Sequence, residues 1–327
     1  MNDLIIQTEE LCKNYIVRNF DVKGFKRLTK AGKKSISALQ NLNIQIEKGE
    51  VVGLIGANGA GKSTTIKLLT GILNPTSGSV RTFGRDPAKN RSANAPHIGI
   101  MMGQRSQLWW DLPAGDSFKL YAKMYRVSEK EYRERFDAFN KILDCSSFMN
   151  RPIRQLSLGQ RMRCEMVAAL IHNPELVFLD EPTIGIDVLA KERIIEFISE
   201  LNRNFGTTVI LTTHDIADMG KIARHIIIID KGKAVYDGSK DKLMQFNQYD
   251  RVQFLFAAPP DRDGFMKKYP NCWFEDDCKV AITNDSAVMS TSELISDIMN
   301  HYKVLDIGIS KTDIETIVKK IYADHNL

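Results

Sequence analysis

One glycine-rich stretch constrains the fold of this chain more than any other feature. The apolar residues 51–55 before it predict a short buried strand, and residues 62–72 carry apolar side chains at helical spacing. This strand–loop–helix pattern is a P-loop, in which glycines let several backbone N–H groups point at one phosphate. We expect Lys62 to reach the outer phosphates and Ser63 to offer its hydroxyl to Mg²⁺. The stretch has the form G-x-x-x-x-G-K-S and consists of Gly56, Ala57, Asn58, Gly59, Ala60, Gly61, Lys62, Ser63 and Thr64.

Further apolar stretches predict that strands alternate with helices along most of the chain. This alternation is typical of an α/β fold whose mostly parallel sheet is covered on both faces. An additional strand is predicted where Leu42, Ile44 and Ile46 alternate with polar residues. Buried strands are predicted at residues 98–102, 176–179, 207–212 and 225–229, and helices within 118–163 and at 191–201.

Two carboxylates follow the predicted strand at residues 176–179. Asp180 can hold Mg²⁺, usually through water, and Glu181 is placed to polarise the water that attacks a phosphate. Two solvated acids at a strand end are the alternative, which a P-loop in the same chain disfavours. The P-loop, Asp180 with Glu181, and His214 all follow strand ends, so we expect them to meet at one edge of the sheet.

Charge is concentrated in one segment of the chain. Between Arg18 and Lys34 there are seven basic residues and one acid, so the remainder of a chain with net charge +5 is close to neutral. Because nucleic-acid binders usually spread basic charge over a face or a domain, we expect no nucleic-acid partner. The segment indicates either a solvated loop or a contact with anionic lipid headgroups or with acidic loops of a membrane protein.

The sequence gives no indication of a membrane span or of secretion. No apolar run approaches the ~18 residues that crossing a bilayer needs, and the amino terminus lacks the pattern of a signal peptide. The five cysteines are scattered and form no C-x-x-C pattern, which favours free thiols in a reducing cytosol.

A short motif before Asp180 links these features to a known family. Leu156-Ser157-Leu158-Gly159-Gln160 resembles the L-S-G-G-Q signature of ATP-binding cassette (ABC) transporter ATPases, with Leu158 in place of the first glycine. The resemblance implies that Ser157, Gly159 and Gln160 open a helix whose positive end contacts the γ-phosphate held by a partner chain.

Four more residues occur in the order of the family's motifs. By resemblance, Tyr15 stacks on adenine, and Gln104 reaches Mg²⁺ and the attacking water. Asp187 matches the D-loop, and His214 matches the histidine that contacts the γ-phosphate. Taken singly, each has a plainer interpretation, such as a core aromatic, a surface amide or a core histidine.

The resemblance covers about residues 4–238. It implies an ABC-type P-loop ATPase domain at residues 1–238, with a helical signature subdomain at about 105–165. Residues 239–327 lose the regular alternation and are expected to form a small C-terminal accessory α+β domain. The implied cofactors are ATP and Mg²⁺, and the implied activity is ATP hydrolysis that powers transport. The implied partners are separate transmembrane permease subunits and a second ATPase subunit, in a homo- or heterodimer at the cytoplasmic face of the membrane.

The stretch 103–113 is similar to ATPases of the export-type branch, which includes drug, polysaccharide and antibiotic-resistance exporters. In the family this region docks onto the membrane subunit, and the adjacent residues Trp109 and Trp110 suit an interface anchor. Two core tryptophans are the alternative.

A non-transport ABC ATPase that acts on ribosomes or DNA is the competing interpretation. Ribosome-acting members usually carry two cassettes, and DNA-repair members carry very long coiled coils between the P-loop and the signature. This chain has one cassette, and about 95 residues separate Lys62 from Ser157. A P-loop kinase does not explain the signature.

Overall fold

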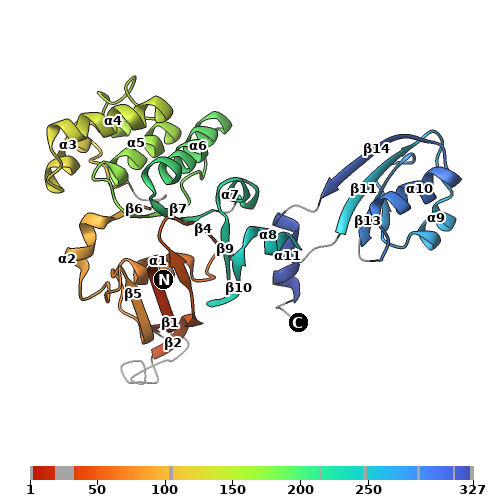
Figure 1. Cartoon of the computed structure of the whole chain (residues 1–327), viewed down its shortest axis with the longest axis horizontal. Coiled ribbons are helices and arrows are strands. Elements are labelled where there is room, and N and C mark those ends of the chain that lie inside the picture. Colours follow the sequence, from red (N-terminus) through yellow and green to blue (C-terminus); the bar gives the residue numbers. More distant parts are fainter. Residues whose placement is uncertain are drawn as a thin grey trace. The chain divides into compact units, whose positions relative to one another are not determined.

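The computed structural model describes residues 3–18, 33–102, 106–213, 215–245, 249–285, 288–311 and 314–324. Gln104, His214 and residues 19–32 of the basic segment therefore lie outside the described residues. The chain divides into two compact units, Met1–Lys240 and Asp241–Leu327 (Figure 1). Within the described ranges, no helix combines the length and the apolar character that crossing a membrane requires.

A six-stranded sheet in the order β10-β9-β4-β8-β7-β6 forms the centre of the first unit. Its strands run parallel except for β10, which pairs antiparallel with β9 at one edge. Every residue of β4 and β8 is buried, as expected for strands covered on both faces. The predicted mostly parallel sheet is thus confirmed. Its strands are β4 (Val51–Ile55), β6 (Ile98–Met102), β7 (Leu176–Asp180), β8 (Thr208–Thr212), β9 (His225–Asp230) and β10 (Lys233–Ser239).

A smaller antiparallel sheet consists of β1 (Leu4–Arg18), β2 (Lys33–Leu42), β3 (Gln45–Glu47) and β5 (Ser77–Thr82). The prediction of one strand over residues 42–46 is wrong, because β2 ends at Leu42 and β3 begins at Gln45. The Thr8 hydroxyl lies at this break. It donates to the Leu42 carbonyl oxygen at 2.9 Å and accepts from the Ile44 backbone N–H at 2.9 Å.

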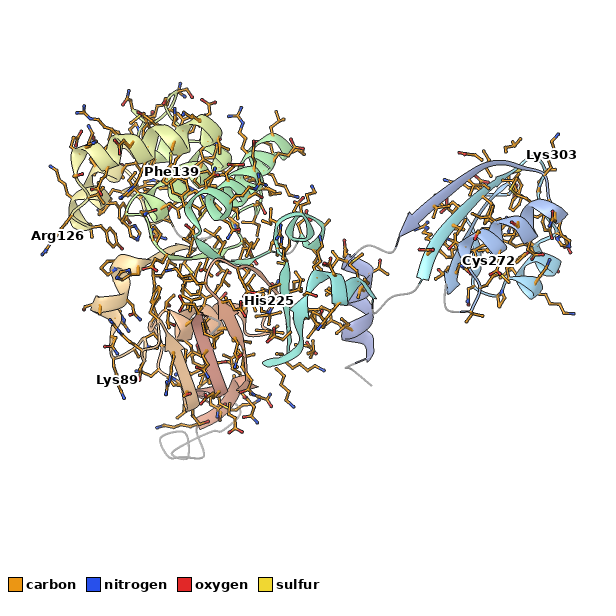
Figure 2. The ribbon with its side chains drawn as sticks, viewed as in Figure 1. Lys89, Arg126, Phe139, His225, Cys272 and Lys303 are labelled. Atoms are coloured by element: carbon orange, nitrogen blue, oxygen red, sulfur yellow. The ribbon has the colours of Figure 1, made fainter. Side chains whose placement is uncertain are left out.

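Helices of the first unit cover the central sheet and form a separate helical layer (Figure 1). One of them, α4, begins at a capping box, in which Ser128 and Glu131 satisfy each other's backbone N–H groups. Phe139 on α4 packs edge-on against Phe197 on α6, with ring centroids 5.2 Å apart (Figure 2). The helices are α1 (Lys62–Leu69), α2 (Arg91–Asn94), η3 (Ala95–His97), α3 (Ala114–Met124), α4 (Glu129–Leu143), η4 (Ile153–Gln155), α5 (Leu158–Leu170), α6 (Val188–Phe205) and α7 (Ile216–Ile222).

The second unit contains a β-α-β-β-α-β arrangement with the antiparallel strand order β12-β13-β11-β14. This is the split βαβ, or ferredoxin-like, topology. Phe254, Phe265, Val280 and Ile298 form its core between one face of the sheet and the two helices. Its elements are α8 (Lys240–Gln245), β11 (Tyr249–Phe256), α9 (Arg262–Lys268), β12 (Cys272–Phe274), β13 (Lys279–Asp285), α10 (Thr291–His301), β14 (Val304–Lys311) and α11 (Ile314–Asp324).

Candidate functional site

The P-loop connects the end of β4 to the start of α1. Gly61 is the N-cap residue of α1 and has φ 118°, a left-handed conformation that favours glycine. A Cβ atom at this position would lie 2.8 Å from the Ala38 carbonyl oxygen, so a side chain would also clash. In the part of the chain that the structure describes, no side chain caps the amino terminus of α1. Its first N–H groups therefore remain available to an anion, which the helix dipole also favours.

A pocket of about 580 Å³ lies against this helix terminus. It brings Lys62 and Ser63 from α1 together with Asp180 and Glu181 from the end of β7. Among the residues that sequence reasoning had not singled out, Lys67 and Met102 also line it. The full lining is Ala38, Ala57, Asn58, Gly59, Gly61, Lys62, Ser63, Thr64, Lys67, Met102, Asp180 and Glu181.

The Ser63 hydroxyl lies 3.2 Å from Oδ2 of Asp180. The other carboxylate oxygen of Asp180 accepts a hydrogen bond from the Thr212 hydroxyl at 2.6 Å. Asp180 and Thr212 face each other in the register of the parallel strands β7 and β8. The sheet thus fixes the Asp180 carboxylate and leaves one oxygen directed at the P-loop.

Glu181 has an unusual backbone conformation, with φ 55°. Few residues other than glycine adopt positive φ, and such positions concentrate at functional sites. The Glu181 N–H lies 3.1 Å from the Thr212 carbonyl oxygen and 3.1 Å from the Thr212 hydroxyl. Thr212 therefore positions both acidic residues, although sequence reasoning did not select it. The available signal was a hydroxyl at the carboxyl end of a buried strand.

Lys62 is only 7% exposed. Its ammonium group donates to the carbonyl oxygens of Gly56 and Ala57, at 3.3 Å from the latter. Burial lowers the pKa of Lys62, while the negative charges of Glu181 and Asp180 act in the opposite direction. A cation held in so desolvated a place interacts more strongly with a phosphate than an exposed lysine does.

Tyr15 lies beside the P-loop rather than in the lining of the pocket. Its hydroxyl is 3.5 Å from the Thr64 hydroxyl, and the Lys13 ammonium lies 5.6 Å from its ring centroid. The ring is half-buried. Tyr15 also pairs with Ile36 across β1 and β2.

The signature residues form a second cluster with Asp187. Ser157 is the N-cap residue of α5 and shares a capping box with Gln160, with bonds of 3.2 and 3.0 Å. Asp187 caps α6 by accepting from the Ala190 N–H at 2.9 Å. A Cβ atom on Gly159 would lie 3.5 Å from Oδ2 of Asp187. None of these residues lines the 580 Å³ pocket.

Trp109 and Trp110 are exposed by 40% and 50%, so the alternative of two core tryptophans is wrong. The Trp109 ring packs against the Tyr121 ring at 5.6 Å, and the Arg161 guanidinium lies 5.7 Å from the Trp110 ring centroid. Tyr121 also lines a pocket of about 220 Å³, whose wall includes Ile72. Through Tyr121, Trp109 thus lies beside a partly apolar hollow.

A strand–P-loop–helix unit, with an acidic pair at the end of a neighbouring parallel strand, defines a P-loop nucleoside triphosphatase. Comparison with known proteins identifies the family more narrowly. The ABC transporter family profile matches residues 39–184. The chain belongs to the ATP-binding proteins of ABC transporters, and it is an ATP-binding and ATP-hydrolysing subunit of such a transporter.

Three relatives illustrate this membership. The chain is 29% identical over 226 residues to the ABC transporter ATP-binding protein NatA of Bacillus subtilis, covering 69% of this chain and 92% of NatA. It is 31% identical over 218 residues to the daunorubicin resistance ATP-binding protein DrrA3 of Streptomyces coeruleorubidus, covering 67% and 68%. It is 33% identical over 215 residues to the zinc uptake system ATP-binding protein ZurA of Listeria innocua, covering 64% and 82%.

Solved structures agree with this assignment. The ATP-binding cassette MJ0796, a dimer in a post-hydrolysis state bound to ADP and Pi, is 28% identical with a TM-score of 0.59. The match covers 72% of this chain and 98% of that one. The ATP-binding subunit of another ABC transporter shares the fold with a TM-score of 0.63, at 24% identity over 74% of this chain and 92% of that one. The family profile and the relatives NatA and DrrA3 support the transporter interpretation over the ribosome or DNA alternative.

Proposed function

We propose that this chain hydrolyses Mg-ATP with Glu181 as the general base. The observation that carries the proposal is the 3.2 Å separation between the Ser63 hydroxyl and the Asp180 carboxylate, inside the pocket that also holds Lys62 and Glu181. A hydroxyl and a carboxylate are hard oxygen donors, which suit Mg²⁺. When bound, the ion neutralises charge on the phosphate oxygens.

Each side chain then has a separate task. Lys62 exchanges its contacts with P-loop carbonyl groups for contacts with phosphate oxygens, aided by the open N–H groups of α1. Glu181 accepts a proton from the attacking water. Gln104 and His214 complete the site as the family resemblance implies, and Tyr15 stacks on adenine.

We also propose that the active site is shared between two ATPase subunits. The P-loop cluster and the signature cluster are separate within one chain, which supports a site completed by Ser157, Gly159 and Gln160 of a second chain. In a head-to-tail pair, each chain supplies its P-loop to one nucleotide and its signature to the other. The two clusters of one chain thus serve different nucleotides.

Mixing two inactive variants tests this sharing. Lys62→Ala disables the P-loop and Ser157→Arg disables the signature, so either variant alone has two defective sites. In a mixed pair, one site combines the intact P-loop of one chain with the intact signature of the other. We expect mixing to restore ATPase activity to a substantial fraction of the parent rate. A mixture as inactive as its components would contradict the shared site.

A separate membrane subunit is the proposed partner of the surface that contains Trp109 and Trp110. Two adjacent exposed tryptophans, one of them beside a hollow, suit an interface anchor because they can bury large apolar areas in a partner's pocket. Trp110→Ala should weaken co-purification with the membrane subunit while soluble ATPase activity is retained. Trp273→Ala is the matched control, since Trp273 is also exposed but belongs to the second unit. If both variants co-purified equally well with the membrane subunit, the assignment of the Trp109–Trp110 surface as its docking site would be wrong.

Export is the proposed direction of transport. The resemblance of residues 103–113 to export-type ATPases and the extra C-terminal unit support it. DrrA3 is named for drug resistance, whereas ZurA is named for zinc uptake, so the relatives include both directions. Transport assays with the chain and its membrane subunit in inside-out vesicles distinguish them. ATP-dependent accumulation inside such vesicles indicates export, and ATP-dependent loss indicates import.

The basic segment is proposed to contact anionic lipid headgroups. Lys33 and Lys34, at the start of β2, are exposed. Each cation near an anionic surface contributes roughly 1 kcal/mol, and salt screens the contact. Replacing Lys23, Lys26, Arg27, Lys30, Lys33 and Lys34 with Gln should leave ATPase activity unchanged and reduce co-sedimentation with phosphatidylserine vesicles. Unchanged co-sedimentation at low salt means that the segment is only a solvated loop.

A further inference from the structure

Among the described residues of the second unit, one strand at the edge of the sheet has a pairing partner on one side only. β14 pairs with β11 on one side and is the last strand in the order β12-β13-β11-β14 (Figure 1). Lys303 marks the point where this strand begins (Figure 2). Two of its apolar side chains, Leu305 and Ile309, are exposed by 63% and 58%. A long edge strand without proline, carrying exposed apolar residues, is a template for pairing with another strand.

The strand register determines which backbone groups point outward. The Phe256 N–H donates to the Cys278 carbonyl oxygen at 2.8 Å, so the even-numbered residues of β11 face β13 and the odd-numbered residues face β14. The odd residues pair with Asp306, Gly308 and Ser310. The backbone groups of Ile307 and Ile309 therefore point to the free edge.

A side-chain contact agrees with this orientation. The Ile307 N–H donates to the Asp306 carboxylate at 2.9 Å instead of to β11. Asp306 therefore occupies a donor that a neighbouring strand would otherwise use. It acts as a competitor for pairing at this edge.

We propose that β14 pairs antiparallel with β14 of a second copy of this chain, with the two-fold axis at Gly308. In this register Ile307 faces Ile309 of the second copy, and Asp306 faces Ser310 of the second copy. The outward backbone groups of Ile307 and Ile309 then bond to each other on both sides of the axis.

Three features of β14 favour a second copy as the partner. The residues with outward backbone groups are the two that this register places opposite each other. Their side chains lie on the helix-covered face of the sheet, because Ile307 and Ile309 pair with the core residues Phe254 and Val252. Isoleucine pairs across strands are favourable cross-strand contacts. Gly308 adds no side chain at the axis, where the two strands approach each other.

Self-association of the nucleotide-free chain tests the proposal. Self-association is measured by analytical ultracentrifugation of the full-length Lys62→Ala protein without nucleotide. Under these conditions a dimer cannot be the ATP-dependent pair of ATPase subunits. In this background Ile309→Lys should weaken self-association at least tenfold, since each dimer contains the change twice. Asp306→Ala should strengthen it, because the competitor for the Ile307 N–H is removed. Met266→Lys is the matched control, because Met266 is an exposed apolar residue on α9 and not part of the sheet, and it should have no effect.

A disulfide tests the register itself. Gly308 faces itself in a non-hydrogen-bonded pair, where Cα atoms lie about 4.5 Å apart, a separation that a disulfide accepts. A Cβ atom at Gly308 finds its nearest neighbour at 3.6 Å, so the site accommodates a side chain. Gly308→Cys should form a disulfide-linked dimer under mild oxidation. Ser310→Cys should not, because residue 310 faces residue 306 of the second copy.

Any one of three results would overturn the proposed β14 pairing. The chain could be monomeric without nucleotide, or Ile309→Lys could leave its self-association unchanged. Alternatively, Gly308→Cys could cross-link no more readily than Ser310→Cys. These outcomes are independent of the mixing experiment with Lys62→Ala and Ser157→Arg. The edge pairing and the shared ATP site therefore fail or succeed separately.

Discussion

At the carboxyl ends of the central strands, Lys62, Ser63, Asp180 and Glu181 meet in one pocket, whereas His225 lies between two carboxylates at the opposite ends. His225 begins β9 (Figure 2). Its Nδ1 is 3.2 Å from the Glu50 carboxylate, and its Nε2 is 2.6 Å from the Asp237 carboxylate. The imidazole thus uses both nitrogens on acidic partners.

The two ends of the sheet differ in what their charges do. In the pocket, the Lys62 ammonium bonds to carbonyl groups of its own loop, and Glu181 is held in a left-handed conformation. At the amino ends, charged groups satisfy each other. The comparison teaches that substitutions at the two ends should separate activity from stability, even though all of these residues belong to one sheet.

The largest expected effect is on nucleotide binding by Lys62→Ala. Losing charge-assisted contacts in a desolvated site should weaken ATP binding about a thousandfold, or ~4 kcal/mol. The free energy of unfolding should change little, because Lys62 is itself a buried charge whose removal relieves desolvation. Fluorescent nucleotide titration and urea denaturation measure the two quantities. If Lys62→Ala weakened ATP binding and also greatly lowered the free energy of unfolding, activity and stability would not be separated between the two ends of the sheet.

The second effect concerns stability and pH at His225. Burial alone lowers its pKa, but hydrogen bonds and charge from Asp237 and Glu50 outweigh burial and raise the pKa from 6.5 to about 9. Because the pKa of His225 is higher in the folded state, the protonated imidazole stabilises the fold, and this contribution is complete below pH 6.5. It is lost as the pH rises toward 9. The loss should amount to about 3 kcal/mol.

Urea denaturation between pH 6 and pH 9.5 measures this loss. In His225→Gln the decline should largely disappear, while nucleotide binding at neutral pH should match the parent. If the free energy of unfolding declined equally with pH in both proteins, His225 would not be the cause of the decline.

A smaller effect is expected for Thr212→Val, which keeps the shape of the side chain and removes its hydroxyl. The Asp180 carboxylate and the Glu181 N–H each lose a partner. The loss of a hydrogen bond to a charged group is worth about 1.5–3 kcal/mol. We expect kcat to fall by roughly 10- to 150-fold, because every 1.4 kcal/mol corresponds to a factor of ten. A variant with unchanged kcat shows that Asp180 and Glu181 are positioned without Thr212.

The smallest effect is expected for Lys48→Ala, at the amino ends of the strands. Lys48 pairs with Glu175 at 2.6 Å, but both side chains are well exposed. Exposed ion pairs contribute about 0–1 kcal/mol, and salt screens them. The free energy of unfolding should therefore fall by less than ~1 kcal/mol, and this difference should vanish at high salt. ATPase activity should not change. If Lys48→Ala lowered the free energy of unfolding as much as His225→Gln does, this ranking of the effects would be wrong.

The central sheet was largely predictable because buried parallel strands appear as short apolar runs. Element ends were less predictable. The helix predicted over residues 62–72 ends at Leu69, because Gly71 takes a left-handed φ of 72° and its backbone lies against Pro87. The alternation of Leu42, Ile44 and Ile46 correctly marked buried side chains but not one continuous strand. Burial and strand pairing are different properties, and alternation reports only the first.

The site was predictable where motifs specify chemistry, and less so where geometry depends on neighbouring strands. Lys62, Ser63, Asp180 and Glu181 follow from their motifs and meet in one pocket. The φ of Glu181 and the two roles of Thr212 arise from the β7–β8 register, which no local pattern encodes. The roles of Gln104 and His214, outside the described residues, stay predictions. The ferredoxin-like order of the second unit was not foreseen beyond a small α+β domain, because its pairings are non-local.

The most direct test of the account measures ATP hydrolysis and ATP binding on the same preparation of Glu181→Gln. The amide keeps the size of the side chain but is a poor proton acceptor, and general-base catalysis contributes about 10²–10⁴-fold. We predict that kcat falls by at least a hundredfold, while fluorescent nucleotide binding stays within about twofold of the parent. Light scattering should show that this variant accumulates as an ATP-dependent dimer. A Glu181→Gln protein that keeps most of its hydrolysis rate would contradict the assignment of Glu181 as the base.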